Sequence, residues 1–302
     1  MSKFITMAWR NMWRNWRRTS IAVIAIVLGL ILLILMDGLI KGSDQAIFGN
    51  AVRLYGGNIQ VHAPGYREKA SRLPLIPLDN AETVLEAVRD EPQVVAASKR
   101  INTGGLVSSR AGTYPVTITA IEPEGEAHIS LIAENISQGR FLANNDGDAV
   151  LIGRALANLL GVNIGDRITL LGQRKDESMR QHTMTIMGIY DLGIAEAEKS
   201  TVFIPIETAQ TLYNLRDQHT EVTINLVSFG GESQLVADFQ AELPNYEVDS
   251  FETLRPEFRQ TLEVKSTVTN FLGFVVLLIA SIGILNLMLM AVFERTREMG
   301  VL

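Results

Sequence analysis

Two long uncharged segments constrain the fold of this 302-residue chain more than any other feature of its sequence. The first, Thr19 to Met36, contains 18 residues without a charge, and the second, Phe271 to Phe293, contains 23. Because a helix rises about 1.5 Å per residue, the second segment would extend roughly 34 Å, and the hydrocarbon core of a bilayer is about 30 Å thick. The sequence therefore predicts two transmembrane helices, over residues 19–40 and 266–293.

The charges before the first segment predict how the chain is oriented. Residues 1–18 carry five basic side chains and no acidic one, and such a positive flank stays on the cytoplasmic side of a membrane. No small-x-small cleavage pattern follows the first segment, so we interpret it as a retained anchor rather than a signal peptide. Both chain ends are then expected in the cytoplasm, with residues 41–265 outside it.

A helical stripe of apolar residues precedes the first predicted span. All three tryptophans recur on one helical face of residues 3–17, and the arginines lie on the opposite face. This pattern is typical of an amphipathic helix that rests in the membrane interface, although a packed helix with tryptophan in a core is the alternative. We expect an interfacial helix over residues 1–18, whose membrane contacts would be Trp9, Trp13, Trp16, Arg10, Arg14 and Arg17.

Small and polar residues within the predicted spans indicate helix packing. Gly29 in the first span and Gly283 in the second would permit close approach of neighbouring helices. Asn286 is polar at membrane depth and is expected to hydrogen-bond to another helix. A role for Asn286 in a transport pathway is the alternative to this structural role.

Between the spans, alternating apolar residues and turn signals predict a mixed α and β domain. The predicted strands are Asn58–His62, Tyr114–Ile121, Ala149–Ile152, Arg167–Leu171, Thr183–Tyr190, Ser200–Ile204 and Glu221–Val227. The predicted helices are Asn80–Asp90, Gly153–Leu160, Glu207–Leu215 and Ser233–Leu243. We expect an inserted part over residues 136–215 and a helical stalk, Thr253–Lys265, that runs into the second span.

The residues that catalysis would need do not form a recognisable pattern. The chain has no cysteine, and its four histidines are widely spaced, so we predict no metal site and no catalytic or cofactor-binding residue. No G-x-x-x-x-G-K-[ST] loop is present, so the chain cannot hold ATP in the manner of a transporter ATPase, and the energy for any work would come from another subunit. The net charge of −6 excludes a generally basic nucleic-acid binder.

Three groups of residues resemble one protein family in their order and spacing. The first is Ala8-Trp9-Arg10-Asn11 with Arg14, Arg17, Arg18 and Thr19, the second is Gly153–Val162 with Ile164–Leu170, and the third is Phe293–Leu302. Together they resemble the FtsX-like ABC transporter permeases of the MacB/LolC/LolE superfamily, also called type VII. The chain ends inside the third motif, before the third and fourth spans of the family, so we expect a truncated chain.

The resemblance implies an α+β membrane protein of the bacterial inner membrane, with a MacB-like extracytoplasmic core domain of porter-like and sabre-like parts. It implies separate ATPase subunits that bind ATP and Mg²⁺, and a second permease copy or paralogue. The expected cargo is a lipoprotein or another amphipathic molecule, with a possible periplasmic partner. The lack of a fused ATPase domain favours the lipoprotein-releasing branch. The cytoplasmic element of residues 294–302 would dock on the ATPase through Glu294, Arg295, Thr296, Arg297, Glu298, Met299 and Gly300.

Other functions remain open at this point. Within the same family, the chain could serve efflux or the regulation of a cell-wall hydrolase. From another class, a two-span receptor would relay an external signal to the cytoplasm, and a coiled coil or a kinase domain after the second span would identify it. A membrane-anchored external enzyme is disfavoured because no coherent catalytic group is present.

Overall fold

The computed structural model describes residues 16–127, 130–175, 178–227 and 231–299, apart from some side chains in its two long helices. The chain divides into two compact units. We call residues 1–45 and 257–302 the helical unit, and residues 46–256 the core unit.

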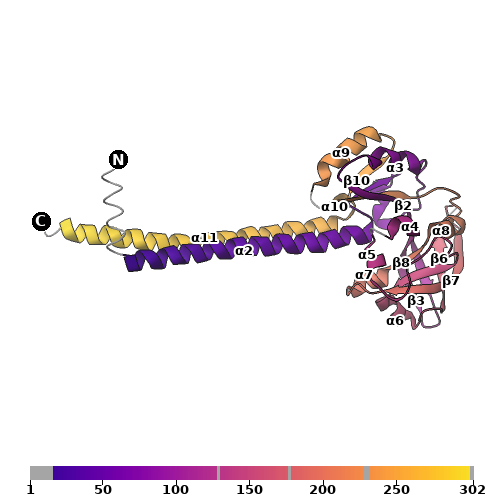
Figure 1. The fold of residues 1–302 in the computed structure, drawn as a ribbon, viewed down its shortest axis with the longest axis horizontal. Helices are drawn as coiled ribbons and strands as arrows, with labels where there is room; N and C mark the ends of the chain where they lie inside the picture. Colours follow the sequence, from indigo (N-terminus) through magenta and orange to yellow (C-terminus); the bar gives the residue numbers. More distant parts are fainter. Residues whose placement is uncertain (1–15, 128–129, 176–177, 228–230, 300–302) are drawn as a thin grey trace. The chain divides into compact units, whose positions relative to one another are not determined.

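The described part of the helical unit belongs to two long helices, α2 (Trp16–Tyr55) and α11 (Pro256–Met299); residues 46–55 of α2 and Pro256 are part of the core unit. Within the helical unit they run antiparallel and side by side (Figure 1). A Cβ atom added at Gly29 of α2 would lie 3.8 Å from Cγ1 of Val276 of α11, so this small residue lies where the helices approach.

Both helices are longer than the apolar segments that they contain. Helix α2 continues to Tyr55, beyond the predicted end at residue 40. Helix α11 is continuous from Pro256, so residues 256–265 of the predicted stalk share one helix with the second apolar segment, whereas Thr253 and Leu254 belong to the separate helix α10 (Phe251–Leu254). Among the residues that the structure describes, no helix combines the length and apolar character that crossing a membrane requires. The two predicted spans therefore stay a prediction.

In the core unit, a four-stranded antiparallel sheet is formed by two β-α-β segments that are far apart in the sequence. One segment comprises β1 (Ile59–His62), α3 (Ala81–Arg89) and β2 (Val94–Ser108). The other comprises β9 (Glu221–Leu226), α9 (Glu232–Glu242) and β10 (Glu247–Ser250). The strand order β10-β1-β9-β2 is that of a split β-α-β fold. We call this part the sheet lobe.

The two faces of this sheet differ in character. On one face, Ile59, Val61 and Ile224 pack against α3 and α9 through Val84 and Phe239, which are all buried. The opposite face is also buried but polar. It carries Gln60 and His62 of β1, Ser98 and Arg100 of β2, Glu221 and Thr223 of β9, and Asp249 of β10.

The chain between β2 and β9 forms a second part, which we call the barrel lobe. Its strands are β3 (Thr113–Ile121), β4 (Ile136–Gly139), β5 (Ala149–Gly153), β6 (Arg167–Gln173), β7 (Met179–Tyr190) and β8 (Thr201–Pro205). The pairings β2–β3–β8–β5–β7–β6–β2 close into a ring. Apolar side chains such as Ile118, Ile152 and Met184 form its core, as expected for a small barrel filled by side chains.

Short helices complete the core unit. They are the 3₁₀ helix η1 (Arg67–Arg72), α4 (Pro123–Glu126), α5 (Leu131–Glu134), α6 (Arg154–Leu160), α7 (Ala195–Ser200), α8 (Ile206–Tyr213) and α10 (Phe251–Leu254). The mixed α/β character of this domain confirms the predicted fold class at that level. The predicted boundary of an inserted part at residues 136–215 stays a prediction.

Candidate functional site

The last turn of α2 is fixed within the core unit. Leu54 is buried in one cluster with Ile132 of α5 and Phe203 of β8, and the Arg53 guanidinium forms an ion pair of 2.5 Å with Glu134. The apolar contacts contribute most of this attachment, because an exposed ion pair adds only about 0–1 kcal/mol.

Gly56 and Gly57 turn the chain directly from α2 into β1. Their amides both donate to the carbonyl of Val52, which ends the helix, and their φ angles are +120° and +82°. A Cβ atom on Gly57 would lie 2.6 Å from the carbonyl oxygen of Ile224 on β9. Both the left-handed backbone and the close approach therefore require glycine at position 57.

The residue that ends α2 contacts the residue that precedes α11. The guanidinium carbon of Arg255 lies 4.9 Å from the centroid of the Tyr55 ring, which is within the range of a cation–π interaction. The carbonyl of Tyr55 accepts a hydrogen bond of 3.2 Å from Nε2 of Gln60 on β1. The ends of both long helices thus meet beside the polar face of the sheet lobe.

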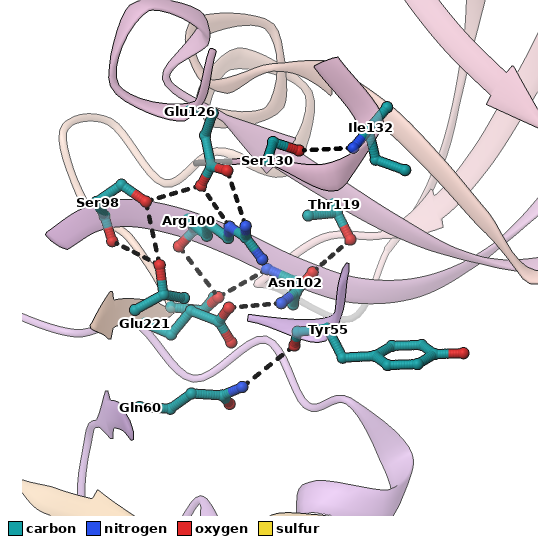
Figure 2. Close-up of polar contacts among 12 residues, drawn as sticks. Tyr55, Gln60, Ser98, Arg100, Asn102, Thr119, Glu126, Ser130, Ile132 and Glu221 are labelled. Carbon is teal, nitrogen blue, oxygen red and sulfur yellow. Dashed lines mark hydrogen bonds and ion pairs between the residues drawn. The ribbon is translucent and has the colours of Figure 1, made fainter. Parts of the chain in front are cut away.

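A buried ion pair is the strongest polar contact on this face (Figure 2). Arg100 of β2 donates from Nε and Nη2 to the two carboxylate oxygens of Glu126 in α4, at 2.6 and 2.8 Å. Ser98 Oγ donates to the same carboxylate at 2.7 Å. Burial alone would raise the pKa of Glu126, but the charge and hydrogen bonds of Arg100 outweigh it and lower that pKa. Both groups are therefore charged, and the pair joins the sheet lobe to the segment that follows β3.

Glu221 is a second buried carboxyl group, next to this pair. On β9 it lies directly opposite Arg100 of β2 and His62 of β1, and one of its oxygens accepts 2.6 Å from Nδ2 of Asn102. Burial raises the pKa of Glu221, while Arg100, the Asn102 amide and Arg255 act to lower it. Burial outweighs these interactions, so the net shift of the Glu221 pKa is upward, whereas that of the Glu126 pKa is downward.

His62 connects Glu221 to the helix ends. Its Nε2 lies 3.2 Å from Oε1 of Gln60 and 4.0 Å from Oε2 of Glu221, and its ring stacks on Tyr66 with centroids 3.6 Å apart. Burial lowers the pKa of His62 to about 4. The ring is therefore neutral at pH 7 and acts as a hydrogen-bonding group.

Among the described residues, no group of three or more His, Asp or Glu side chains is placed to hold a metal ion. Arg100, Glu126 and Glu221 are buried and contact one another or Asn102, whereas Asp249 pairs with Arg67 through one carboxylate oxygen, and in the described part of the chain its other oxygen has no hydrogen-bond partner. The network links β1, β2 and β9 to α4 and to the end of α2, and we call it the polar junction.

None of the residues that the sequence predicted as functional sites belongs to the polar junction. Trp16 and Arg17 are in the first turn of α2, where Trp16 is exposed, and Gly29 faces Val276. Residues Trp9, Arg10, Trp13, Arg14 and Gly300 lie outside the described residues, as do the side chains of Gly283, Asn286, Glu294, Arg295, Thr296, Arg297, Glu298 and Met299. These assignments stay predictions.

The polar junction was not predicted, although the sequence contains a signal for it. Ser98, Arg100 and Asn102 recur with a period of two, and so do Glu221, Thr223 and Asn225. Such alternation is usually taken for the solvent face of a strand. In the structure the two stripes lie side by side on one buried face of the sheet, because β2 and β9 are paired neighbours and Arg100 lies opposite Glu221.

Comparison with known proteins identifies relatives of the whole chain. The profile of the family described as MacB-like periplasmic core domain matches residues 19–242. A lipoprotein-releasing system transmembrane protein LolC from Xylella fastidiosa is 20% identical over 93% of this chain and 67% of its own length. A macrolide export ATP-binding/permease protein MacB from Nitrosomonas europaea is 24% identical over 98% of this chain and 45% of its own length.

A solved structure was also found. The periplasmic region of MacB from Actinobacillus actinomycetemcomitans superposes with a TM-score of 0.44 and 11% identity, over 70% of this chain and 95% of that structure. The chain spans about two thirds of the length of the LolC relative and less than half of the MacB relative.

Proposed function

Because this chain belongs to the MacB-like periplasmic core domain family of FtsX- and MacB-type permeases, we propose that it acts as the permease subunit of an ABC transporter. The observation that carries the proposal is the family match over residues 19–242. The LolC and MacB relatives, which align with more than nine tenths of the chain, support it. The chain itself is then not an enzyme, and a separate subunit binds and hydrolyses ATP with Mg²⁺.

The proposal includes two membrane spans, residues 19–40 and 266–293, with both chain ends in the cytoplasm and the core unit beyond the inner membrane. Large apolar side chains are exposed along both helices, among them Leu28, Leu32, Leu277 and Ile282. A helix that is apolar on all sides favours an apolar surrounding, and the basic residues before α2 favour this orientation.

In this proposal, the segment Glu294–Gly300 docks on the ATPase, and nucleotide-driven closure of the ATPase displaces α2 and α11. The displacement can change the equilibrium of the permease only if the nucleotide-bound ATPase contacts its two states differently. The contact between Tyr55 and Arg255 supports this mechanism, because both helices meet at the polar junction.

The cargo in this proposal is a lipoprotein or another amphipathic molecule, released through paired permeases. The name of the LolC relative favours lipoprotein release. The name of the MacB relative favours macrolide export as the second candidate.

The coupling can be tested in the full-length permease, reconstituted in nanodiscs with the ATPase that co-purifies with it. We expect Glu298→Arg to reduce the stimulation of ATP hydrolysis by the permease, whereas Glu86→Arg on the exposed surface of α3 should leave it unchanged. Equal stimulation and transport in both variants would contradict the coupling role of residues 294–300. Proteoliposomes that contain either a lipidated protein or a macrolide separate the two cargo classes.

The topology has its own test in intact spheroplasts. External protease should cleave within residues 46–256 and leave both chain ends protected, and alkaline carbonate should leave the protein in the membrane fraction. An uncleaved core unit, or extraction by carbonate, would contradict the proposed spans without bearing on the coupling experiment.

A further inference from the structure

Strand β2 belongs to both lobes, and one segment of it is paired on one side only. On the edge opposite β3, strand β2 pairs with β9 as far as Arg100 and with β6 from Gly105 onward. Between these points, residues 101–104 keep ladder pairing with β3 alone. Glycine at position 104 further weakens the segment, because it has no side chain to pack and more conformational freedom in a strand. We call residues 101–104 the β2 bridge.

Asn102 occupies the middle of the β2 bridge and bonds to both lobes. Its backbone amide donates to Oγ1 of Thr220 at 2.8 Å, and its Nδ2 donates to Glu221 at 2.6 Å, both at the start of β9. Its Oδ1 accepts 2.6 Å from the hydroxyl of Thr119 on β3 (Figure 2). These side chains are all buried. They replace the missing ladder bonds across the gap, and we call Asn102, Thr119, Thr220 and Glu221 the clasp.

A series of close contacts leads from the clasp to the helix ends. Nε2 of the neutral His62 ring packs 4.0 Å from Oε2 of Glu221, which is too far for a hydrogen bond, and lies 3.2 Å from Oε1 of Gln60. Gln60 donates to the carbonyl of Tyr55 at 3.2 Å, and the Tyr55 ring contacts Arg255. Every member of this series is within the core unit.

We propose that the β2 bridge is a hinge between the sheet lobe and the barrel lobe, that the clasp holds it in one position, and that Tyr55 and Arg255 control the clasp. Displacement of Tyr55 or Arg255 weakens the contact series to Glu221, and the lobes then reorient about residues 101–104. This inference concerns the mechanics of the core unit and does not depend on which cargo, if any, the protein moves.

Of the two glycines in β2, Gly104 allows the hinge to be altered without disrupting the fold. A Cβ atom on Gly104 would meet no atom within 4 Å, and its φ is not in the left-handed region. Gly104→Ala therefore fits the observed structure and restricts only the freedom of the bridge. At Gly105 the same change would place Cβ 2.4 Å from Ile118 Cδ1 and 2.6 Å from the carbonyl oxygen of Leu171, so that position is unsuitable.

The chain contains no cysteine, so two introduced cysteines can be labelled selectively. Glu86 on α3 and Asn158 on α6 are exposed and belong to different lobes. Spin labels at Glu86→Cys and Asn158→Cys in the full-length protein in nanodiscs report the distribution of distances between the lobes by double electron–electron resonance.

We expect Asn102→Ala and Thr119→Val to broaden this distribution, and Gly104→Ala to narrow it. Thr185→Val is the matched control, because it makes the same change on β7 of the barrel lobe, away from the β2 bridge and the clasp. If Asn102→Ala does not fold, Thr119→Val, which removes a single hydroxyl, still tests the clasp. Distributions equal to wild type in both Thr119→Val and Gly104→Ala would overturn the hinge.

The link to the helices is tested with the same labels. Tyr55→Leu and Arg255→Gln should broaden the distribution as Thr119→Val does. If Thr119→Val broadens the distribution while both helix-end variants leave it unchanged, the control of the clasp by the helix ends is refuted. None of these measurements uses ATP hydrolysis or transport, so their outcome is separate from that of the proposed function.

Discussion

Arg255 lies over the ring of Tyr55, 4.9 Å from its centroid, where α2 ends and α11 is about to begin. We expect Tyr55→Leu to destabilise the core unit, because it removes the cation–π contact with Arg255, a contribution of about 0.5–2 kcal/mol. Tyr55→Phe, which keeps the ring, should retain most of the stability in a denaturant titration. Equal midpoints for Tyr55→Leu and wild type would contradict this role.

The ion pair of Arg100 and Glu126 predicts a strong asymmetry between single and double substitutions. Glu126→Gln leaves the buried guanidinium without its carboxylate and should lower the free energy of unfolding by about 3–5 kcal/mol. Arg100→Met together with Glu126→Leu should cost much less than the sum of the single changes, because an apolar pair leaves no buried charge. Additive losses across this double-mutant cycle would show that the two side chains act independently.

Gly57 should tolerate no side chain. Gly57→Ala forces a φ of +82° on alanine and brings Cβ to 2.6 Å from Ile224 O, so we expect a loss of about 2 kcal/mol or more. Gly49→Ala is the matched control, since its Cβ meets nothing within 4 Å inside α2. It should raise helix stability by up to about 1 kcal/mol. Thermal unfolding of the two variants tests the difference, and similar melting temperatures would refute it.

The buried histidine predicts a dependence of stability on pH. Unfolded His62 binds a proton near pH 6.5, but burial lowers its folded pKa to about 4. Between these values the unfolded state binds more protons, so stability is complete above pH 6.5 and falls as the pH drops toward 4. The loss assigned to this group is on the order of 3 kcal/mol.

His219 also has a pKa lowered to about 4 by burial and by Lys99. Two histidines therefore contribute to the loss of stability between pH 6.5 and 4. His62→Gln should therefore flatten, without abolishing, the slope of unfolding free energy between pH 6.5 and 4. An unchanged slope in that variant would assign the whole effect to other groups.

Two buried tyrosines should respond in opposite directions to the same substitution. Among the described residues, the Tyr213 hydroxyl is buried without a hydrogen-bond partner, whereas the Tyr190 hydroxyl donates to the carbonyl of Thr201 at 2.8 Å. Tyr213→Phe should leave stability unchanged or raise it by about 1 kcal/mol, and Tyr190→Phe should lower it by a similar amount. Equal effects in urea unfolding would indicate that the Tyr213 hydroxyl is bonded in solution.

The sequence predicted the elements whose apolar residues have a regular period. The predicted strands correspond to β1, β3 and β5 to β9, and the predicted helices to α3, α6, α8 and α9. Strand β2 was missed because Lys99, Arg100 and Gly104 are typical of surface loops, and their partners lie on distant segments. Strands β4 and β10 were missed because each has four residues with a single large apolar side chain, whereas the equally short β1 has two alternating ones, Ile59 and Val61.

Local patterns in the sequence could not predict the polar junction. A single buried carboxyl such as Glu221 is unfavourable in isolation and becomes acceptable only beside Arg100, Asn102 and His62. Those contacts join residues more than one hundred positions apart in the sequence. The fold places them together because β1 and β2 flank β9, a strand order that composition and spacing do not reveal.

The register of β1 and β10 has a mechanical consequence. Ile59, which follows the turn after α2, pairs with Ser250, which precedes α10 and α11. A force that pulls the two helix ends apart would therefore act on the same end of this strand pair. Its hydrogen bonds would break one pair at a time, starting at Ile59 and Ser250, and strands pulled apart in this direction resist force least. Tyr55 and Arg255 lie between the helix ends and this first strand pair, so we expect their cation–π contact to break before β1 separates from β10.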